Sequence, residues 1–257
     1  MEKVKAKKHL GQHFLTDENI AKKIVDGLSF QDYQDVLEVG PGTGVLTKYL
    51  LEKPTETFVA EIDTESIEYL KLHYSKLQNH HFTGDFLKLN VPEIFQNQVA
   101  VIGNFPYNIS SQILFKIIDY YQQIPGMVGM FQKEVAERTA AVPRTKDYGI
   151  LSVLVQAYYD VKYLFTVHEN VFNPPPKVKS GVIKMTRNRK EGLEGNEILF
   201  KQIVKTGFNQ RRKKLSNALK PLNIPESLKN HAFMDKRAEE LSVEDFINFT
   251  IEWKTAN

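Results

Sequence analysis

Hydrophobic positions follow two different periods along residues 17–185. Residues 17–28 place Ile20, Ile24, Val25 and Leu28 on one helical face behind Asp17, a residue suited to capping a helix start. Beyond this helix, short apolar runs typical of buried strands alternate with longer amphipathic segments typical of helices. The pattern predicts strands over 36–39, 57–62, 81–83, 99–102 and 127–131, and helices over 45–51, 65–77, 111–121, 133–141 and 150–159.

This alternation indicates βαβ units and a mostly parallel sheet. Residues 161–167 and 181–185 are predicted to be two further strands without a long helix between them, forming a hairpin that adds an antiparallel strand. We therefore expect an α/β fold with a Rossmann-like, seven-stranded, doubly wound sheet.

The pattern changes after Thr186, where the remaining chain is helical and basic. Ser242 stands as an N-cap before Val243, with acidic residues in the first turn of the last helix. We predict a large α/β domain over 1–187 and a small all-helical domain over 188–257. The expected helices in the second domain cover 198–208, 213–219, 225–228, 237–241 and 243–253.

Composition excludes several classes of protein. The chain has no cysteine, which rules out disulfides, zinc ribbons, thiol nucleophiles and the cysteine-ligated zinc of nucleobase deaminases. The histidines show no metal-ligand spacing, and adjacent His80 and His81 are interpreted as solvated surface, so no metal is expected. No apolar run approaches the roughly 18 residues of a membrane span, and no apolar signal core follows the N-terminal lysines. We expect a cytoplasmic monomer without membrane contact.

Positive charge is concentrated in two places. Residues 187–220 hold ten lysines and arginines against three glutamates, whereas the whole chain has a net charge of +3. Lys3, Lys5, Lys7 and Lys8 form a second cluster near Glu2. Clustered cations release counterions from phosphates, which favours a nucleic-acid partner. A solvated charged face explains the composition equally well.

A glycine-rich turn follows the strand 36–39. Its sequence Gly40-Pro41-Gly42-Thr43-Gly44 allows close backbone approach to a ligand at Gly40 and Gly42. The spacing is G-x-G-x-G, with Val45 where the third glycine of a dinucleotide fingerprint would fall. It therefore favours a cofactor without a pyrophosphate over the nicotinamide cofactor of a dehydrogenase. A tight strand–helix turn without a ligand is the alternative.

Acidic and apolar side chains at the next strand ends complete a predicted nucleotide site. Glu61 ends the second strand and can accept hydrogen bonds from ribose hydroxyls. Asp85 follows the third strand and can accept from an adenine amine, while Phe86 and Ile62 can cover the two faces of the ring. Each of these residues alone is explained as well by a position in a loop or in the core, but their order at successive strand ends of a parallel sheet favours one shared site.

The sequence Asn104-Phe105-Pro106-Tyr107 follows the fourth strand and suggests a reaction. Pro106 stiffens the turn, which displays the Asn104 side-chain oxygen and the Phe105 carbonyl as acceptors. Two acceptors on the hydrogens of an exocyclic adenine amine would aim its lone pair at a sulfonium methyl group. Tyr107 offers a flat face for the base, and Phe172 in a proline-rich loop is a candidate for the other face. The structural alternatives are a rigid turn without a catalytic role for Asn104–Tyr107 and a position in the hydrophobic core for Phe172.

These residues resemble the KsgA-type ribosomal RNA small-subunit adenine N6,N6-dimethyltransferases over nearly the whole chain. The motifs that carry the resemblance are Lys8–Leu15, Leu37–Gly44, Glu61–Asp63, Gly84-Asp85, Asn104–Ser110, Gln132–Arg138, Phe172–Val178 and Phe208–Leu215.

The resemblance implies a seven-stranded class I methyltransferase sheet and a function in ribosome biogenesis. The domain over 1–187 would be the catalytic, S-adenosylmethionine-binding domain, and the helical domain over 188–257 would bind RNA. The enzyme would transfer four methyl groups from S-adenosylmethionine to two adjacent adenosines in a hairpin loop near the 3′ end of 16S rRNA, in the small (30S) subunit or its precursor, leaving S-adenosylhomocysteine. It also implies that Asn104 and the Phe105 carbonyl hold the amine, and that Tyr107 and Phe172 sandwich the base. The implied cofactor contacts are His13, Leu15, Gly40, Glu61, Asp85 and Asn104.

Two departures and three alternatives accompany this resemblance. The family often has Asn in place of His13 and Leu in place of Phe105. Relatives that methylate large-subunit RNA share the catalytic half, but the basic run Arg211-Arg212-Lys213-Lys214 favours the small-subunit branch and is the predicted RNA contact. An RNA-binding assembly factor that methylates incidentally, and a dehydrogenase, are the other two readings.

Overall fold

The computed structural model describes residues 4–256, so Lys3 and Glu2 of the N-terminal basic cluster lie outside the described residues. The chain divides into two compact units. Unit 1 contains the residues up to 136 together with 161–187, and unit 2 contains 137–160 together with the residues from 188 onward.

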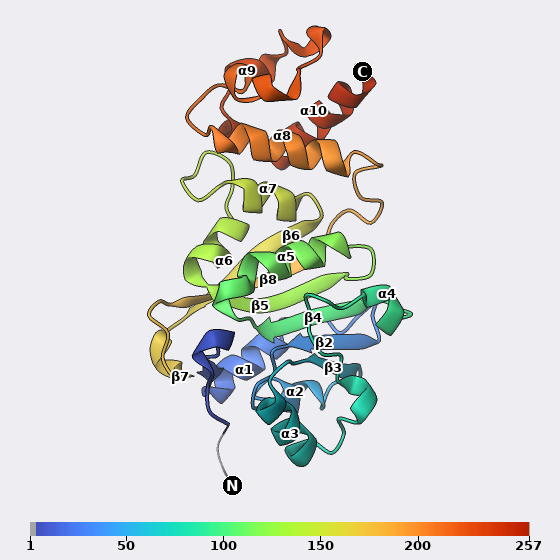
Figure 1. The fold of residues 1–257 in the computed structure, drawn as a ribbon, viewed down its shortest axis with the longest axis vertical. Helices are drawn as coiled ribbons and strands as arrows, with labels where there is room; N and C mark the ends of the chain where they lie inside the picture. The colour runs from blue at the N-terminus through green and yellow to red at the C-terminus, as the bar shows by residue number, and fades with distance from the viewer. Residues whose placement is uncertain (1–3, 257) are drawn as a thin grey trace. The chain divides into compact units, whose positions relative to one another are not determined.

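Unit 1 is built on a six-stranded sheet in the order β3-β2-β4-β5-β8-β6 (Figure 1). Strands β2, β3, β4 and β5 run parallel, and β8 pairs antiparallel with β5. The predicted Rossmann-like α/β fold is confirmed. The bounds are β2 (Asp35–Val39), β3 (Glu56–Ala60), β4 (Val99–Asn104), β5 (Gly126–Gln132), β6 (Tyr159–Val167) and β8 (Ser180–Arg187).

The strand predicted at 81–83 is reduced to one parallel bridge between Phe82 and Val59. Residues 79–81 form a 3-10 turn instead, and Gly84 turns the chain away immediately afterwards with a φ of 78°. Thr83 still donates its backbone N–H to the Val59 carbonyl at 2.9 Å. The segment therefore reaches the sheet edge, although it is too short to extend the ladder beyond six strands.

A separate two-stranded sheet joins distant parts of unit 1. Strand β1 (Phe14–Leu15) pairs antiparallel with β7 (Phe172–Asn173), so that Leu15 lies opposite Phe172. Thr16 adds hydrogen bonds from its backbone N–H and its hydroxyl to the Val171 carbonyl, at 2.8 and 2.9 Å. This pairing fixes the N-terminal segment against the proline-rich loop.

Helices cover the sheet with their apolar faces. In α1 (Glu18–Val25), Asp17 accepts a hydrogen bond from the Ile20 N–H as the predicted cap, and Ile24 is fully buried in the main hydrophobic cluster. Helix α5 (Ser110–Asp119) crosses in front of β5 and β8 in Figure 1 and buries Leu114. The remaining helices of this part are α2 (Thr47–Leu50), α3 (Thr64–His73), α4 (Val91–Ile94) and α6 (Lys133–Thr139), which begins in unit 1 and ends in unit 2.

Unit 2 is helical and has an aromatic core. Its helices are α7 (Ile150–Gln156), α8 (Glu197–Asn209), α9 (Leu215–Ala218) and α10 (Val243–Thr255). Phe246, Phe249 and Trp253 of α10 are buried, and Ser242 caps this helix as predicted by accepting from the Asp245 N–H at 3.1 Å. The helices expected at 225–228 and 237–241 are single 3-10 turns.

Residues 137–160 belong to unit 2 because of their side-chain contacts. Helix α7 packs on α8, and the buried Tyr148 hydroxyl donates to the Leu241 carbonyl at 3.0 Å. The strand–helix alternation that continues through this segment had placed it in the expected 1–187 domain.

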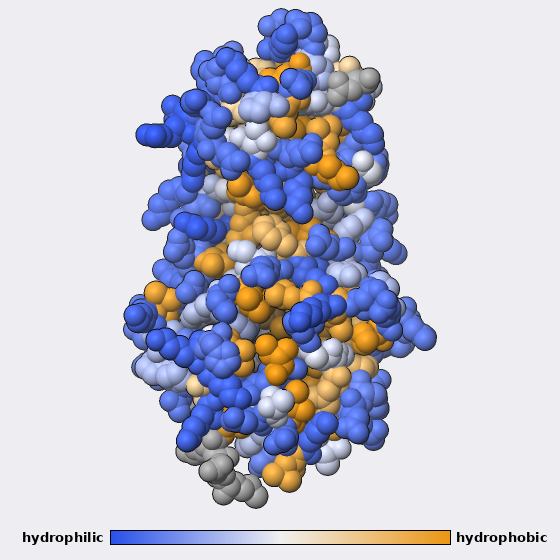
Figure 2. All heavy atoms as spheres, viewed as in Figure 1, coloured by the Kyte–Doolittle hydropathy of each residue, from blue (hydrophilic) through white to orange (hydrophobic). Residues whose placement is uncertain are grey.

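Hydrophilic side chains cover most of the face visible in Figure 2, with hydrophobic residues in separate patches between them. Among residues 4–256, no helix combines the length and apolar character that crossing a bilayer needs.

Glu38 is a buried carboxyl group within β2. Its side chain is 1% exposed and accepts a hydrogen bond from the Thr47 hydroxyl at 2.6 Å. Burial raises the pKa of Glu38 to about 8; the Thr47 hydrogen bond lowers it in part, and the nearby charge of Glu61 raises it further. Glu38 is therefore protonated in the folded chain at neutral pH.

This burial predicts a pH dependence of stability. Between about pH 5 and 8 the folded chain holds a proton on Glu38 that the unfolded chain has lost, so the free energy of unfolding falls as pH rises, by up to about 1.4 kcal/mol per pH unit. Glu38→Gln mimics the protonated form and should flatten this slope. Urea unfolding of both proteins across this range measures it, and parallel slopes would show that Glu38 is ionised in the fold.

Candidate active site

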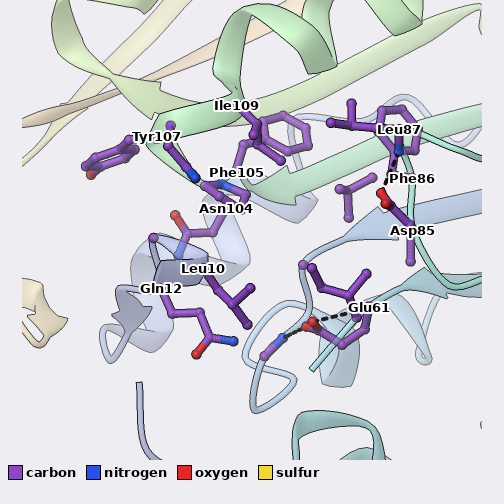
Figure 3. Close-up of a pocket in the computed structure, with 18 of the residues that line it drawn as sticks. Leu10, Gln12, Glu61, Asp85, Phe86, Leu87, Asn104, Phe105, Tyr107 and Ile109 are labelled. Atoms are coloured by element: carbon purple, nitrogen blue, oxygen red, sulfur yellow. Dashed lines mark hydrogen bonds between the residues drawn. The ribbon is translucent and has the colours of Figure 1, made fainter. Parts of the chain in front are cut away.

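A cavity of about 290 Å³ lies at the carboxyl edge of the parallel strands. Its lining comes from the ends of β2, β3 and β4 and from a segment that we call the N-terminal strap, residues 7–14. Figure 3 shows Tyr107 and Gln12 toward one side of the cavity and Asp85 and Phe86 toward the other, with Asn104 and Glu61 between them. The sequence-predicted residues that line it are His13, Gly40, Gly42, Glu61, Ile62, Asp85, Phe86, Asn104, Phe105, Pro106 and Tyr107.

The glycine turn forms the floor of the site beside the strap. Gly40 and Gly42 have φ values of 70° and 55°, in the left-handed region that favours glycine. A Cβ at Gly42 would lie 2.7 Å from the Phe14 ring. The turn therefore needs glycine both for its conformation and for the close approach of Phe14.

Glu61 is held at the end of β3 by backbone donors. One carboxylate oxygen accepts from the N–H groups of Ile62 and Asp63, each at 2.9 Å, and the other accepts from Gly42 at 3.2 Å. Burial raises the pKa of Glu61 above its ordinary value, although these three hydrogen bonds oppose the shift. The carboxylate is thus fixed beside the glycine turn, where it can accept from a ligand hydroxyl.

The residues predicted to surround an adenine ring lie together. The Ile62 side chain is 56% exposed and lines the cavity, which leaves an apolar face available to a ligand. Phe86 is buried, and one Asp85 oxygen accepts from the Leu87 N–H at 3.0 Å. This set of carboxylate acceptors and apolar side chains fits the adenosine part of S-adenosylmethionine.

Asn104 at the end of β4 is oriented by the strap. Its amide nitrogen donates to the His13 carbonyl at 2.8 Å. Because an amide has its oxygen opposite its donor, this bond leaves the Asn104 oxygen free to accept a hydrogen bond.

Phe105 is accommodated by two glycines. Its backbone N–H donates to the Met130 carbonyl at 3.1 Å, and its ring is buried against Phe131 with 4.8 Å between centroids. A Cβ at Gly129 would lie 2.0 Å from this ring, and one at Gly103 would lie 2.8 Å away. Glycine in the adjacent strand therefore provides the room for a ring where leucine is common in the family.

Tyr107 lies in the turn after Pro106, between the strap and the end of β8. Its hydroxyl is 2.5 Å from the Ser180 hydroxyl, and its ring stacks on His13 with 5.6 Å between centroids. Burial raises the pKa of Tyr107, with the Ser180 hydrogen bond acting against the shift. The His13 Nδ1 lies 2.8 Å from the Pro174 carbonyl, so it carries a hydrogen and donates.

Leu15 and Phe172 are placed elsewhere. Both are buried, with Phe172 only 4% exposed in the main hydrophobic cluster, and neither is among the described residues that line the cavity. Their pairing across β1 and β7 explains this burial. The Phe172 ring is therefore covered by neighbouring side chains in this structure, and its role as the second face of a base sandwich with Tyr107 stays a prediction.

The basic run in unit 2 divides into two kinds of residue. Arg211 forms an ion pair with Glu239 at 2.5 Å and donates to the carbonyls of Thr145 and Lys146, and Lys214 pairs with Asp235 at 2.9 Å. The side chains of Arg212 and Lys213 are exposed, and no side-chain partner is found for them in the described chain.

One group of possible metal ligands occurs within residues 4–256, formed by Glu56, His80 and His81. The Gln78 N–H donates to the His81 Nδ1 at 2.8 Å, so the hydrogen of this ring is on Nε2, which donates to Glu56 at 3.0 Å. The ring nitrogen nearest Glu56 is thus occupied by a proton in this arrangement. The absence of a metal stays a prediction.

Sequence reasoning missed a network around Asp63. Its carboxylate is fully buried and accepts from Lys7, Gln12 and Ser66. Burial alone would raise the pKa of Asp63, but these hydrogen bonds outweigh it and hold the pKa below its ordinary value. Gln12 and Asp63 lie within motifs already noted, whereas nothing in the sequence distinguishes Lys7 from its neighbouring lysines.

Comparison with known proteins places the chain in a family. The family model described as "Ribosomal RNA adenine dimethylase" matches residues 3–255. The chain belongs to the ribosomal RNA adenine dimethylase family. It is 61% identical over 251 residues to ribosomal RNA small subunit methyltransferase A of Flavobacterium johnsoniae, covering 97% of this chain and 96% of that one. It is 57% identical over 252 residues to the protein of the same name from Cytophaga hutchinsonii, covering 97% and 98%.

Solved structures agree with this family. A dimethyladenosine transferase from Plasmodium falciparum superimposes with a TM-score of 0.80 at 27% identity, covering 95% of this chain and 98% of that one. The 23S rRNA methyltransferase ErmE has a TM-score of 0.68 at 24% identity, covering 94% and 99%, and shares the fold. Members of this family and fold use S-adenosylmethionine, which the side chains of the cavity fit.

The packing of Phe105 against Gly129 predicts that substitutions at these two positions compensate each other. Gly129→Ala should lower the free energy of unfolding by about 1–3 kcal/mol because the new Cβ overlaps the Phe105 ring. Adding Phe105→Leu should restore part of this loss, and Phe105→Leu alone provides the reference. Chemical unfolding of the three variants and the parent measures the coupling. Additive losses in the double variant would mean that the two side chains do not compete for the same space.

Proposed function

We propose that this chain is an S-adenosylmethionine-dependent rRNA adenine N6,N6-dimethyltransferase of the small ribosomal subunit. Its acceptors are two adjacent adenosines in a hairpin loop near the 3′ end of 16S rRNA, which receive four methyl groups. Support for the small subunit comes from relatives at 61% and 57% identity that carry the name ribosomal RNA small subunit methyltransferase A. The enzyme acts on the 30S subunit or its precursor during ribosome biogenesis.

We assign the cofactor to the cavity of unit 1. Glu61 binds the ribose hydroxyls, the partly exposed Asp85 carboxylate accepts from the adenine amine, and the exposed Ile62 covers one face of the ring. The order of these residues along the cavity supports this assignment, because Asp85 and Phe86 lie away from Asn104 and Glu61 lies between (Figure 3). When bound there, S-adenosylmethionine supplies an electrophilic methyl group.

The chemistry depends on two acceptors at the end of β4. The Asn104 oxygen and the Phe105 carbonyl accept the two hydrogens of the adenine N6 amine, which directs the nitrogen lone pair toward the methyl carbon. S-adenosylmethionine held by Glu61 and Asp85 would supply the methyl group to this nitrogen, and its sulfur would keep the electron pair of the S–C bond. The methylated nitrogen would lose a proton to water, and a second S-adenosylmethionine would supply the second methyl group.

Tyr107 supplies the aromatic platform for the target base. Its ring is partly accessible at the cavity, and its hydroxyl is anchored to Ser180. Stacking on such a ring holds a base that has left its helix. Phe172 supports this site indirectly, because it is buried in β7, whose pairing with β1 fixes the strap that orients Asn104.

One observation carries the proposal: the hydrogen bond from the Asn104 amide to the His13 carbonyl, which leaves the oxygen of this cavity-lining side chain free to accept. The test is methyl transfer from tritiated S-adenosylmethionine to unmethylated small subunits, with large subunits as control and nucleoside analysis of the product. We expect N6,N6-dimethyladenosine from the small subunit alone. Label on the large subunit would instead assign the protein to the relatives that methylate large-subunit RNA. Tight binding to the small subunit without label would favour an assembly factor.

The exposed basic residues predict RNA affinity. Arg212→Glu with Lys213→Glu should weaken binding to small subunits about tenfold or more and lower its salt dependence, because two phosphate contacts are lost. Arg211→Glu serves as the contrast: it breaks the ion pair with Glu239, so we expect it to lower thermal stability first. An unchanged salt slope in the double variant would place the RNA surface on other residues.

A further inference from the structure

Asp63 connects the N-terminal strap to the body of unit 1. Its buried carboxylate accepts from Lys7 and from the Gln12 amide, the latter at 3.1 Å, and both donors belong to the strap. From α3 the same carboxylate accepts from the Ser66 hydroxyl at 3.0 Å and from the Glu65 N–H at 3.3 Å. One carboxylate therefore binds two parts of the chain that are about 50 residues apart in sequence.

The backbone of Asp63 links this connection to the ligand site. Its N–H donates to Glu61 at 2.9 Å, within the set of donors that fixes the Glu61 carboxylate. The strap is also closed on itself, because the Lys7 N–H donates to the Gln12 side-chain oxygen at 2.8 Å. Displacement of the strap therefore disturbs the residue next to Glu61.

The strap forms one wall of the cavity between two attachments. Residues 9–14 line the cavity, and Figure 3 shows Leu10 and Gln12 on this wall near Asn104. At one end the strap is held by Asp63, and at the other by the pairing of β1 with β7 and by the His13–Asn104 hydrogen bond. The attachment at β1 is a backbone pairing with buried side chains. The opposite attachment depends on the Lys7 and Gln12 side chains, and Lys7 also pairs with Glu65 of α3 at 3.1 Å.

We propose that Asp63 is a positioning residue whose carboxylate latches the strap, and that this latch controls the entry of S-adenosylmethionine and the release of S-adenosylhomocysteine. The inference rests on the proposed function, since it requires the cofactor to bind in this cavity. A charge-assisted hydrogen bond to a buried carboxylate is strong enough to hold a wall closed, and it can be lost without breaking backbone pairing. The latch must open once for each of the four transfers.

Lys7→Met is the direct test, because it removes the charged donor and keeps most of the unbranched side chain. We expect the dissociation rate of S-adenosylhomocysteine, measured by stopped-flow competition on the full chain, to rise about tenfold with a matching rise in Kd. The KM for S-adenosylmethionine should rise while kcat is unchanged or higher. Lys7→Arg should restore the parental values, which a role in folding alone would not explain.

Ser66→Ala is the matched control. It removes a hydrogen bond to the same carboxylate from α3 without touching the strap, so its dissociation rate should stay within about twofold of the parent. A dissociation rate for Lys7→Met equal to that of the parent would overturn the latch, and so would equal effects of Lys7→Met and Ser66→Ala.

Glu61→Gln separates failure of the latch from failure of the proposed site. Loss of S-adenosylmethionine affinity in Glu61→Gln, together with unchanged kinetics in Lys7→Met, would reject the latch alone. Unchanged affinity in Glu61→Gln would reject the cavity as the cofactor site, and the latch with it.

Discussion

The hydrogen bond from the Asn104 amide to the His13 carbonyl joins the two parts of the candidate site. On one side is the rigid end of β4, held in register with β2 and β5 by the parallel ladders. On the other side is the strap, which has no ladder of its own beyond the two residues of β1. Because the strap carbonyl accepts from the amide, the catalytic oxygen has one orientation, and both the cofactor wall and the acceptor depend on the same contact.

This dependence explains why so much of unit 1 serves to place the strap. Leu15 and Phe172 are buried against each other, the His13 ring donates to Pro174 and stacks on Tyr107, and Asp63 holds the opposite end. Methyl transfer to an amine held by a preorganised acceptor needs no strong base nearby, because the acceptor is fixed in position before the reaction begins. The histidine side chain at position 13 adds an aromatic contact to Tyr107. Asn104 is oriented by the backbone carbonyl of this residue, which does not depend on the side chain.

The sequence predicted elements with a clear period and residues at strand ends. Helix α1 with its Asp17 cap, strands β2 to β5, and the convergence of Gly40, Glu61 and Asn104 all follow from local patterns and from the geometry of parallel sheets. Strands β1 and β7 could not be predicted, because two residues have no period and their pairing spans the length of unit 1. The burial of Phe172 follows from that pairing and agrees with the core position that the sequence left open as an alternative.

Other differences also come from tertiary contacts. Residues 137–160 have the same local alternation as the rest of the sheet domain, but Tyr148 and α7 pack with unit 2. The sequence does not distinguish the four cations of residues 211–214 from one another. In the structure, however, Arg211 pairs with Glu239 and Lys214 pairs with Asp235, and both partners lie more than 20 residues away. Partners of this kind are fixed by the fold and not by the local sequence.

Asn104→Asp tests the central claim most directly. The variant has nearly the same shape and keeps acceptor oxygens, but it cannot donate to the His13 carbonyl, so the orientation of the acceptor is lost. Single-turnover methyl transfer to small subunits should fall by about a hundredfold or more, with RNA binding close to that of the parent. A rate within about threefold of the parent would show that the bond to His13 does not orient the catalytic oxygen, and would contradict the account.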